Sequence, residues 1–268
     1  MKNTIKLIAV DLDGTLLNSR KEIPPGFIPM VNRLYKNGIR FVAASGRQYY
    51  KLVEMFQSVA DKLFFFSENG GLIFDGDQNI FCRPIREDLY LSLLQIGTEL
   101  QAVTVLSGIH NAYICNAYTQ PERDAASIYY GRYTFSIDPI SEIKNNRDSI
   151  VKVAIYDPVN VEQNCMGHFS QFKNELNVSL AGRNWIDIMR ADVDKGVAMK
   201  YLQQKLDITP QQCMAFGDYL NDLEMLNQVE FSYAMANSHP DIITSANYRA
   251  PSNDDDGVMR VLNSVFTS

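Results

Sequence analysis

The chain has 268 residues, of which 46% are apolar and 21% are charged, as in an ordinary globular protein rather than a disordered or fibrous one. Its 25 Lys and Arg against 31 Asp and Glu give a formal net charge of −6. This balance argues against nucleic acid or an anionic membrane as the main partner, because both favour clustered basic side chains. No apolar run approaches the roughly 18 residues of a membrane span, and the apolar run near the N-terminus is too short for a signal peptide. We therefore expect a cytoplasmic protein, of an oligomeric state that the sequence leaves unknown.

The first eighty residues alternate between apolar runs and amphipathic segments. Short apolar runs, typical of strands buried on both faces, occur at 5–10, 39–44 and 63–66. Apolar residues recur at helical spacing in the two intervals between them, at 27–34 and 49–56. This order predicts a parallel sheet with helical crossovers, and a hairpin around Asp75-Gly76-Asp77 is expected to follow it.

The pattern changes after about residue 83 and returns near Lys195. In between, helices are expected at 86–101 and 160–175, and strands at 103–106, 112–115, 150–156 and 178–181. The strands at 103–106 and 112–115 look like those of an exposed sheet. After Lys195, helix, strand, helix and strand are expected at 196–206, 213–216, 220–227 and 231–235. We therefore predict an α/β core of residues 1–84 and 185–268, with a separate α+β domain inserted at 85–184.

Polar side chains follow the predicted core strands where each strand ends. Open parallel sheets bind ligands beyond the carboxyl ends of their strands, so these residues converge on one edge. Asp11 and Asp13 leave the first strand two positions apart and can face the same side, where two carboxylates need a cation or a proton. Asp218, after the strand at 213–216, adds an oxygen ligand of the kind that Mg²⁺ prefers. Lys195 and Ser45 complete a set of groups suited to a phosphoryl group.

Taken together, these motifs resemble those of a known enzyme family. The segments Asp11-Leu12-Asp13-Gly14-Thr15-Leu16, Ser45-Gly46-Arg47, Lys195-Gly196 and Phe216-Gly217-Asp218-(x2)-Asn221-Asp222 are similar to the four motifs of haloacid dehalogenase-like (HAD) phosphatases. The long interval between the second and third motifs resembles the Cof-type subfamily IIB, sugar-phosphate phosphatases with a C2B cap. Residues 234–237 and 252–258 also look like C-terminal signatures of that subfamily. The resemblance implies a Rossmann-like parallel-sheet HAD core with an inserted α+β cap of the C2B type.

The resemblance also implies a role for each motif residue. Asp11 would be the nucleophile that forms an aspartyl-phosphate, and Asp13 would be the general acid and base. Asp11, Asp218 and the backbone carbonyl of Asp13 would hold Mg²⁺. The phosphate oxygens would be bound by Leu12, Ser45, Gly46, Lys195 and Asn221. Asp222 would orient Lys195 or a metal-bound water rather than touch the substrate.

The implied function is that of a Mg²⁺-dependent phosphatase, a phosphoric monoester hydrolase that acts on small phosphorylated metabolites such as sugar phosphates. One alternative is a phosphoryl-transfer enzyme such as a phosphomutase. Another is a non-catalytic phospho-acceptor module, but the acceptor aspartate of such modules follows the third strand, where this chain has Ser67-Glu68-Asn69. The sequence does not identify the substrate.

Four further features of the sequence, three single residues and one loop, stand outside these assignments. Ser45 stands where many relatives have threonine, and Tyr219 stands where a small residue is common. Asn69-Gly70-Gly71 resembles a loop that lies near the site in the family, although a simple turn explains it equally well. Trp185 is part of a hinge, a substrate contact or ordinary packing.

Overall fold

A computed structural model describes residues 4–181 and 183–266 and divides the chain into two compact units. The first unit consists of Met1–Gly46, Phe56–Ile80 and Asp194–Ser268, and the second of Arg47–Met55 and Phe81–Val193. No helix in the described ranges is both long and apolar enough to cross a bilayer.

The first unit is built on an eight-stranded sheet with the strand order β14-β13-β12-β1-β2-β3-β4-β5. Its strands are β1 (Leu7–Asp11), β2 (Arg40–Ala44), β3 (Leu63–Ser67), β4 (Leu72–Asp75), β5 (Gln78–Cys82), β12 (Cys213–Gly217), β13 (Phe231–Met235) and β14 (Tyr248–Ala250). The six strands from β14 to β3 are parallel, and β4 pairs antiparallel with β3. The predicted parallel sheet and the hairpin after it are confirmed.

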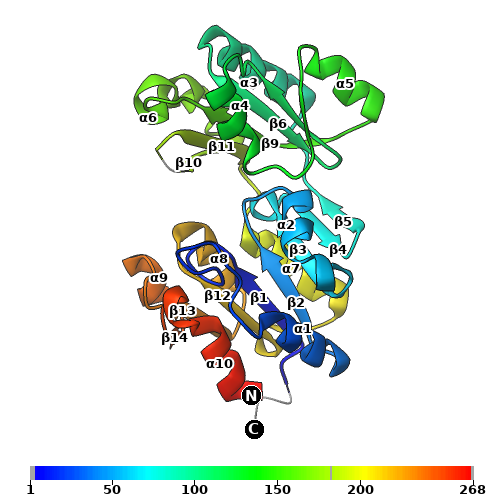
Figure 1. Ribbon diagram of the computed structural model, residues 1–268, viewed down its shortest axis with the longest axis vertical. Helices are drawn as coiled ribbons and strands as arrows, with labels where there is room; N and C mark the ends of the chain where they lie inside the picture. The colour runs from blue at the N-terminus through cyan, green and yellow to red at the C-terminus, as the bar shows by residue number, and fades with distance from the viewer. Residues whose placement is uncertain (1–3, 182, 267–268) are drawn as a thin grey trace. The chain divides into compact units, whose positions relative to one another are not determined.

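Helices lie against both sides of this sheet (Figure 1), so the residues of β1 and β3 are buried throughout. The helices are α1 (Phe27–Lys36), α7 (Lys195–Leu206), α8 (Leu223–Asn227), α9 (Pro240–Ser245) and α10 (Gly257–Phe266). Short 3₁₀ helices are η1 (Gln57–Lys62), η2 (Glu68–Gly70), η4 (Pro210–Gln212), η5 (Leu220–Asp222) and η6 (Asn253–Asp255). In α1 the buried side chains are the ones at helical spacing, Phe27, Met30, Val31 and Leu34, as predicted.

The second unit contains a six-stranded sheet with the strand order β10-β11-β9-β6-β7-β8. Its strands are β6 (Val103–Gly108), β7 (Ala112–Cys115), β8 (Tyr133–Phe135), β9 (Ile150–Tyr156), β10 (Leu176–Leu180) and β11 (Trp185–Arg190). Neighbouring strands are antiparallel except for the parallel pair β7 and β8. The helices are α2 (Tyr49–Met55), α3 (Glu87–Glu99), α4 (Gln120–Ser127), α5 (Pro139–Asn146), α6 (Val161–Asn164) and the 3₁₀ helix η3 (Met166–Phe172).

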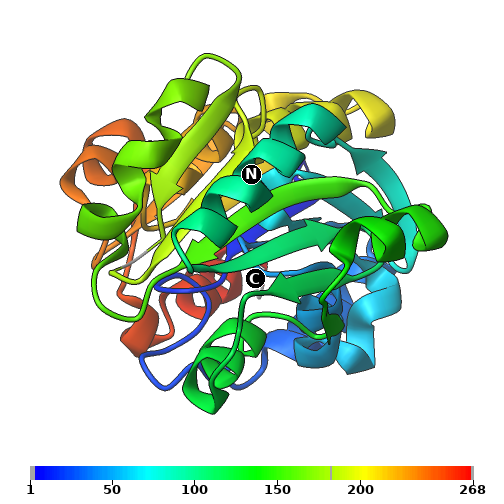
Figure 2. The same cartoon turned by 90° about the horizontal axis from the view of Figure 1, so that it is seen from above.

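Both faces of this second sheet are covered. Figure 2 shows α3 lying across the sheet, and Leu93 of α3 belongs to a core cluster with Leu106 and Val153. Alternate residues of the same strands, including Val105, form a second cluster with Ala126 of α4. The interpretation of β6 and β7 as exposed-sheet strands is therefore wrong, because every residue of both strands is buried.

The second unit differs from the predicted insert at its edges. Trp185–Arg190, expected in the core, forms β11, and its Ile186 and Ile188 join the core of the second sheet. The helix expected at 160–175 is broken into α6 and η3, with a non-helical Cys165 between them. Trp185 packs against the rings of Tyr129 and Tyr156, which favours its interpretation as ordinary packing.

Helix α2, expected in the core, belongs to the second unit, and a buried amide lies just before it. The Gln48 side chain accepts the N–H groups of Gly131 and Arg132 at 3.0 and 2.9 Å and donates to the Arg132 carbonyl at 2.8 Å. The Arg132 guanidinium also lies 3.9 Å from the ring centre of Tyr50. These contacts join the start of α2 to the segment that enters β8.

Candidate active site

One buried lysine joins two of the predicted site carboxylates. Lys195 is the first residue of α7, and its side chain is fully buried. Its ammonium donates to Asp11 Oδ1 at 2.5 Å and to Asp222 Oδ1 at 2.6 Å. The helix begins there because the side chain of Asp194 caps it, accepting the Val197 N–H at 2.7 Å. The cap thus fixes the point from which Lys195 reaches the end of β1.

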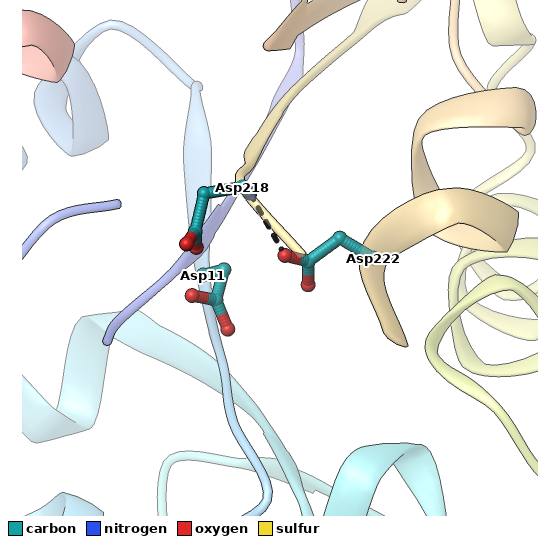
Figure 3. Close-up of side chains that lie close together, drawn as sticks. All are labelled: Asp11, Asp218 and Asp222. Atoms are coloured by element: carbon teal, nitrogen blue, oxygen red, sulfur yellow. Dashed lines mark hydrogen bonds between the residues drawn. The ribbon is translucent and has the colours of Figure 1, made fainter. Parts of the chain in front are cut away.

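Asp222 is held from two sides. In addition to Lys195, its Oδ2 accepts the backbone N–H groups of Asp218 and Tyr219 at 3.0 and 3.2 Å. Figure 3 shows the Asp218–Asp222 hydrogen bond, with Asp218 above Asp11 and Asp222 to its right in this view. With both oxygens engaged by protein donors, Asp222 has the contacts that an orienting role for Lys195 requires.

Asp218, at the end of β12, is positioned by the first motif. The Thr15 hydroxyl donates to Asp218 Oδ1 at 2.8 Å. Gly14 has φ +83°, and a Cβ at this position would lie 2.3 Å from Asp218 Oδ2. Glycine is therefore required by the backbone conformation and by the close approach of the carboxylate. Burial raises the pKa of Asp218 to about 6, against the opposing effect of the Thr15 hydrogen bond.

The three carboxylates carry more negative charge than the protein balances. Asp11, Asp218 and Asp222 can each offer one oxygen within 4.8 Å of the others, and this is the one such cluster found in the described residues. Burial raises the pKa of Asp11 well above its ordinary value, and the Asp222 charge raises it further. Burial lowers the pKa of Lys195, but Asp11 and Asp222 more than offset this and raise it above its ordinary value.

A divalent cation fits this charge distribution. One ammonium among three carboxylates leaves two negative charges uncompensated, and a cation of charge two would lower the pKa of Asp11 and keep it ionised. The donors are all carboxylate oxygens, as Mg²⁺ prefers. Since Asp222 is engaged by Lys195 and by two backbone N–H groups, Asp11 and Asp218 are the better ligands.

The second motif meets the fourth through Asn69. Ser45 is buried, and its carbonyl accepts the Asn69 N–H at 3.0 Å. Asn69 is left-handed, with φ 51°, and its side-chain oxygen accepts from Asn221 Nδ2 at 3.2 Å. A Cβ on Gly46 would lie 3.1 Å from the Asn69 amide nitrogen. Asn69 therefore links three predicted phosphate-binding residues, which favours its interpretation as part of the site over that of a simple turn.

The first motif places Asp13 apart from the carboxylate cluster. Its side chain is 41% exposed, and its Oδ1 accepts from Lys21 Nζ at 2.7 Å. Leu12 between the two aspartates is fully buried, and its carbonyl accepts the N–H groups of Thr15 and Leu17. The motif thus directs Asp11 into the buried cluster and Asp13 toward the surface.

Three residues of this region have no role in the sequence interpretation. Thr15 lies in the first motif, where its hydroxyl is the signal that could have linked it to Asp218. Asn237 lies in a C-terminal signature and donates to the Gly14 carbonyl at 2.7 Å. Lys21 lies in a polar loop with no motif. Tyr219, noted for its size, is 58% exposed, and its ring lies edge-on to His239 at 5.7 Å.

Comparison with known proteins decides the family. The family model described as haloacid dehalogenase-like hydrolase matches residues 8–262. The chain belongs to this family. It is 30% identical over 266 residues to the Escherichia coli K12 protein named 5-amino-6-(5-phospho-D-ribitylamino)uracil phosphatase YbjI, covering 98% of this chain and 97% of that protein.

Solved structures of the family share the fold. The crystal structure of SMU.1108c from Streptococcus mutans UA159 matches with a TM-score of 0.83 at 30% identity, over 98% of this chain and 100% of that chain. A haloacid dehalogenase-like hydrolase from Bacteroides thetaiotaomicron matches with a TM-score of 0.84 at 23% identity, again over 98% and 100%. The predicted family and α/β fold class are confirmed, and the protein is a hydrolase of the HAD type.

Proposed function

We propose that this HAD-family enzyme is a Mg²⁺-dependent phosphatase of small phosphorylated metabolites that works through an aspartyl-phosphate on Asp11. One observation carries the proposal: a buried carboxylate at the end of β1 meets both a buried ammonium and a second carboxylate that suits a metal. A nucleophile for phosphorus has to be ionised, desolvated and accompanied by positive charge. Burial desolvates Asp11, Lys195 places positive charge beside it, and bound Mg²⁺ would keep it ionised.

In the first half-reaction, an oxygen of Asp11 attacks phosphorus in line with the leaving oxygen. The P–O bond to the substrate breaks as the Asp11–phosphorus bond forms, and the carboxyl of Asp13 gives its proton to the leaving alcohol. In the second half-reaction, Asp13 takes a proton from a water that attacks the aspartyl-phosphate. Inorganic phosphate leaves, and Asp11 and Asp13 return to their starting states.

The remaining residues bind and orient the phosphoryl group. Lys195 places its charge beside Asp11, where the transferred group must arrive. The Ser45 hydroxyl, the Asn221 amide and the backbone N–H groups of Leu12 and Gly46 would hold the phosphate oxygens. Asp11, Asp218 and the Asp13 carbonyl would hold Mg²⁺, which supplies charge stabilisation for the oxygens of the transferred group.

The proposed substrate class is the phosphate ester of a sugar or sugar alcohol. The E. coli relative is named for a substrate with a phosphorylated ribityl chain, which belongs to this class. We also propose that the second unit serves as the substrate-selecting cap and that the enzyme acts in the cytoplasm, where such metabolites occur. The net charge of −6 supports a small-molecule substrate over nucleic acid.

A phosphate-release assay tests this function. Purified protein with Mg²⁺ would be offered sugar phosphates, ribitol phosphate, nucleotides, pyridoxal phosphate and flavin mononucleotide, without any bisphosphate activator. We expect release that is fastest from sugar or sugar-alcohol phosphates and absent in Asp11→Asn. Phosphate release that needs a bisphosphate would indicate a phosphomutase instead, and equal release by Asp11→Asn would contradict the proposed nucleophile.

A further inference from the structure

We propose that Lys21 is a positioning residue for Asp13, held in place by the two C-terminal signatures, and this inference rests on the proposed function. The Lys21 ammonium donates to Asp13 Oδ1 at 2.7 Å. Both side chains are well exposed, at 61% and 41%. Ion pairs this exposed contribute little to stability, so a contribution to the fold does not account for the structure built around the pair.

The loop that carries Lys21 is closed by local hydrogen bonds. The side-chain oxygen of Asn18 accepts the N–H groups of Arg20 and Glu22 at 2.9 and 3.0 Å. The Lys21 N–H donates to the Asn18 carbonyl at 2.8 Å. Lys21 itself has φ 63°, a left-handed conformation that non-glycine residues adopt only at a cost. The loop therefore keeps Lys21 in an unfavourable backbone conformation that brings its side chain back to Asp13.

The C-terminal signatures attach the same segment to the body of the first unit. Asn237 donates to the Gly14 carbonyl at 2.7 Å, and Asn253 donates to the Leu17 carbonyl at 2.9 Å. Asp254 accepts the N–H and the hydroxyl of Ser19 at 2.7 and 2.5 Å. The chain between Asp13 and Lys21 is thus fixed at three points. The residues of the two C-terminal signatures hold this segment in place.

A fixed ammonium on one oxygen decides the orientation of the Asp13 carboxyl. An exposed carboxylate without a partner samples several rotamers, and only some of them bring an oxygen to the leaving group. Lys21 on Oδ1 restricts this freedom and holds the carboxyl in one orientation for proton transfer. Lys21 orients the Asp13 carboxyl before the proton is transferred. This orientation therefore affects kcat/KM only when the leaving group needs a proton.

The dependence on the leaving group provides the test. The value of kcat/KM would be measured for the best sugar phosphate from the release assay and for p-nitrophenyl phosphate, whose phenolate leaves without protonation. We expect Lys21→Met to lower kcat/KM about tenfold for the sugar phosphate and less than about twofold for p-nitrophenyl phosphate. Lys21→Arg, which keeps the charge and the donors, should recover most of the loss. Equal losses on the two substrates would overturn the proposal.

Arg20→Met is the matched control. Arg20 lies in the same loop and is 80% exposed, but it pairs with Glu22 at 3.0 Å instead of Asp13. A general loss of loop structure would affect both variants, whereas positioning affects only Lys21. We expect Arg20→Met to keep the wild-type kcat/KM on both substrates; a sugar-phosphate loss equal to that of Lys21→Met would overturn the proposal.

A double-mutant cycle separates the inference from the function on which it rests. In an Asp13→Asn background, Lys21→Met should change kcat/KM for the sugar phosphate by less than about twofold, because its effect passes through Asp13. If the two losses multiply instead, Lys21 does not act through Asp13 and the inference fails. If Asp13→Asn impairs the enzyme but Lys21→Met does not, only the inference fails. If Asp13→Asn itself leaves sugar-phosphate turnover intact, the proposed function fails first.

Discussion

The two units each bury a lysine, and the two lysines have very different partners. Lys195 in the first unit is fully buried and bonded to two carboxylates at 2.5 and 2.6 Å. Lys152 in the second unit is 5% exposed, and its ammonium lies 3.6 Å from Asp187 and 6.0 Å from the centre of the Tyr130 ring. These are the two buried lysines among the residues that the structure describes.

The difference in charge balance distinguishes a site from a packed interior. Lys195 belongs to a cluster with three carboxylates, which therefore keeps a surplus of two negative charges. Burial and, after it, the Asp222 charge raise the pKa of Asp11. Lys152 of β9 and Asp187 of the adjacent strand β11 bring one positive and one negative charge together at 3.6 Å, beside a cluster that includes Val105 and Ala154. Burial alone does not indicate chemistry; buried charge that the protein leaves unbalanced does, because it needs a ligand.

Among changes to the carboxylate cluster around Lys195, Asp11→Asn should have the largest effect on turnover. The change removes the nucleophile and a metal ligand but almost no volume, so we expect turnover to fall by a factor on the order of 10⁴ or more, with the fold intact. Phosphate release and circular dichroism measure the two effects. Borohydride trapping during wild-type turnover should label Asp11, and label on another residue would contradict the assignment.

Lys195→Met should damage both activity and stability. Loss of one charged contact to the transferred group costs about 10²–10³ in kcat. The variant also leaves Asp11 and Asp222 without their ammonium, which costs about 3–5 kcal/mol of unfolding free energy at neutral pH. Denaturant titration checks this value, and the loss should shrink as the pH falls and Asp11 takes up a proton. A loss of stability that does not change with pH would contradict the charge argument.

Asp218→Asn should have the opposite effect on the metal-free protein. The folded pKa of Asp218 is about 6 against an ordinary 3.8, so wild-type stability falls as the pH rises through this window. The variant does not titrate there and should be more stable above pH 6 by about 1–2 kcal/mol, a gap that closes below about pH 4. Thr15 can still donate to the amide oxygen. Melting curves in a chelator measure the gap.

The same pair of proteins tests the metal. Mg²⁺ should raise the melting temperature of the wild type above pH 6 and have little effect on Asp218→Asn. Activity of the variant should fall with the loss of the metal ligand, and chelation should abolish wild-type activity. Full wild-type activity after thorough chelation would contradict the metal mechanism.

Part of the site and of the fold could be predicted from the sequence alone. Strand ends in a parallel sheet converge, so Asp11, Ser45 and Asp218 were predictable from short apolar runs followed by polar residues. Lys21 was not, because its contact with Asp13 depends on a left-handed loop closed by Asn18. In the second unit α4 and β8 escaped prediction, since α4 buries only Ala126 and the three residues of β8 are all exposed. Helices and strands whose apolar residues show no periodicity cannot be predicted from the hydrophobic pattern of the sequence.

The smallest effect is expected from removing the balanced pair of the second unit as a whole. Lys152→Met alone leaves the Asp187 carboxylate, 13% exposed, without its ammonium, and should cost about 1–3 kcal/mol of unfolding free energy. Lys152→Met with Asp187→Leu removes both charges and leaves neither the ammonium nor the carboxylate buried alone, so the double variant should be within about 1 kcal/mol of the wild type. Hydrolysis of acetyl phosphate, whose leaving group is small, should be unchanged in both.

A second substitution of this kind cannot restore the activity of Lys195→Met, because the partners of Lys195 include the proposed nucleophile Asp11. Loss of acetyl phosphate hydrolysis in the stable double variant would mean that the pair of the second unit also has a part in the chemistry, and that charge balance does not separate the two lysines.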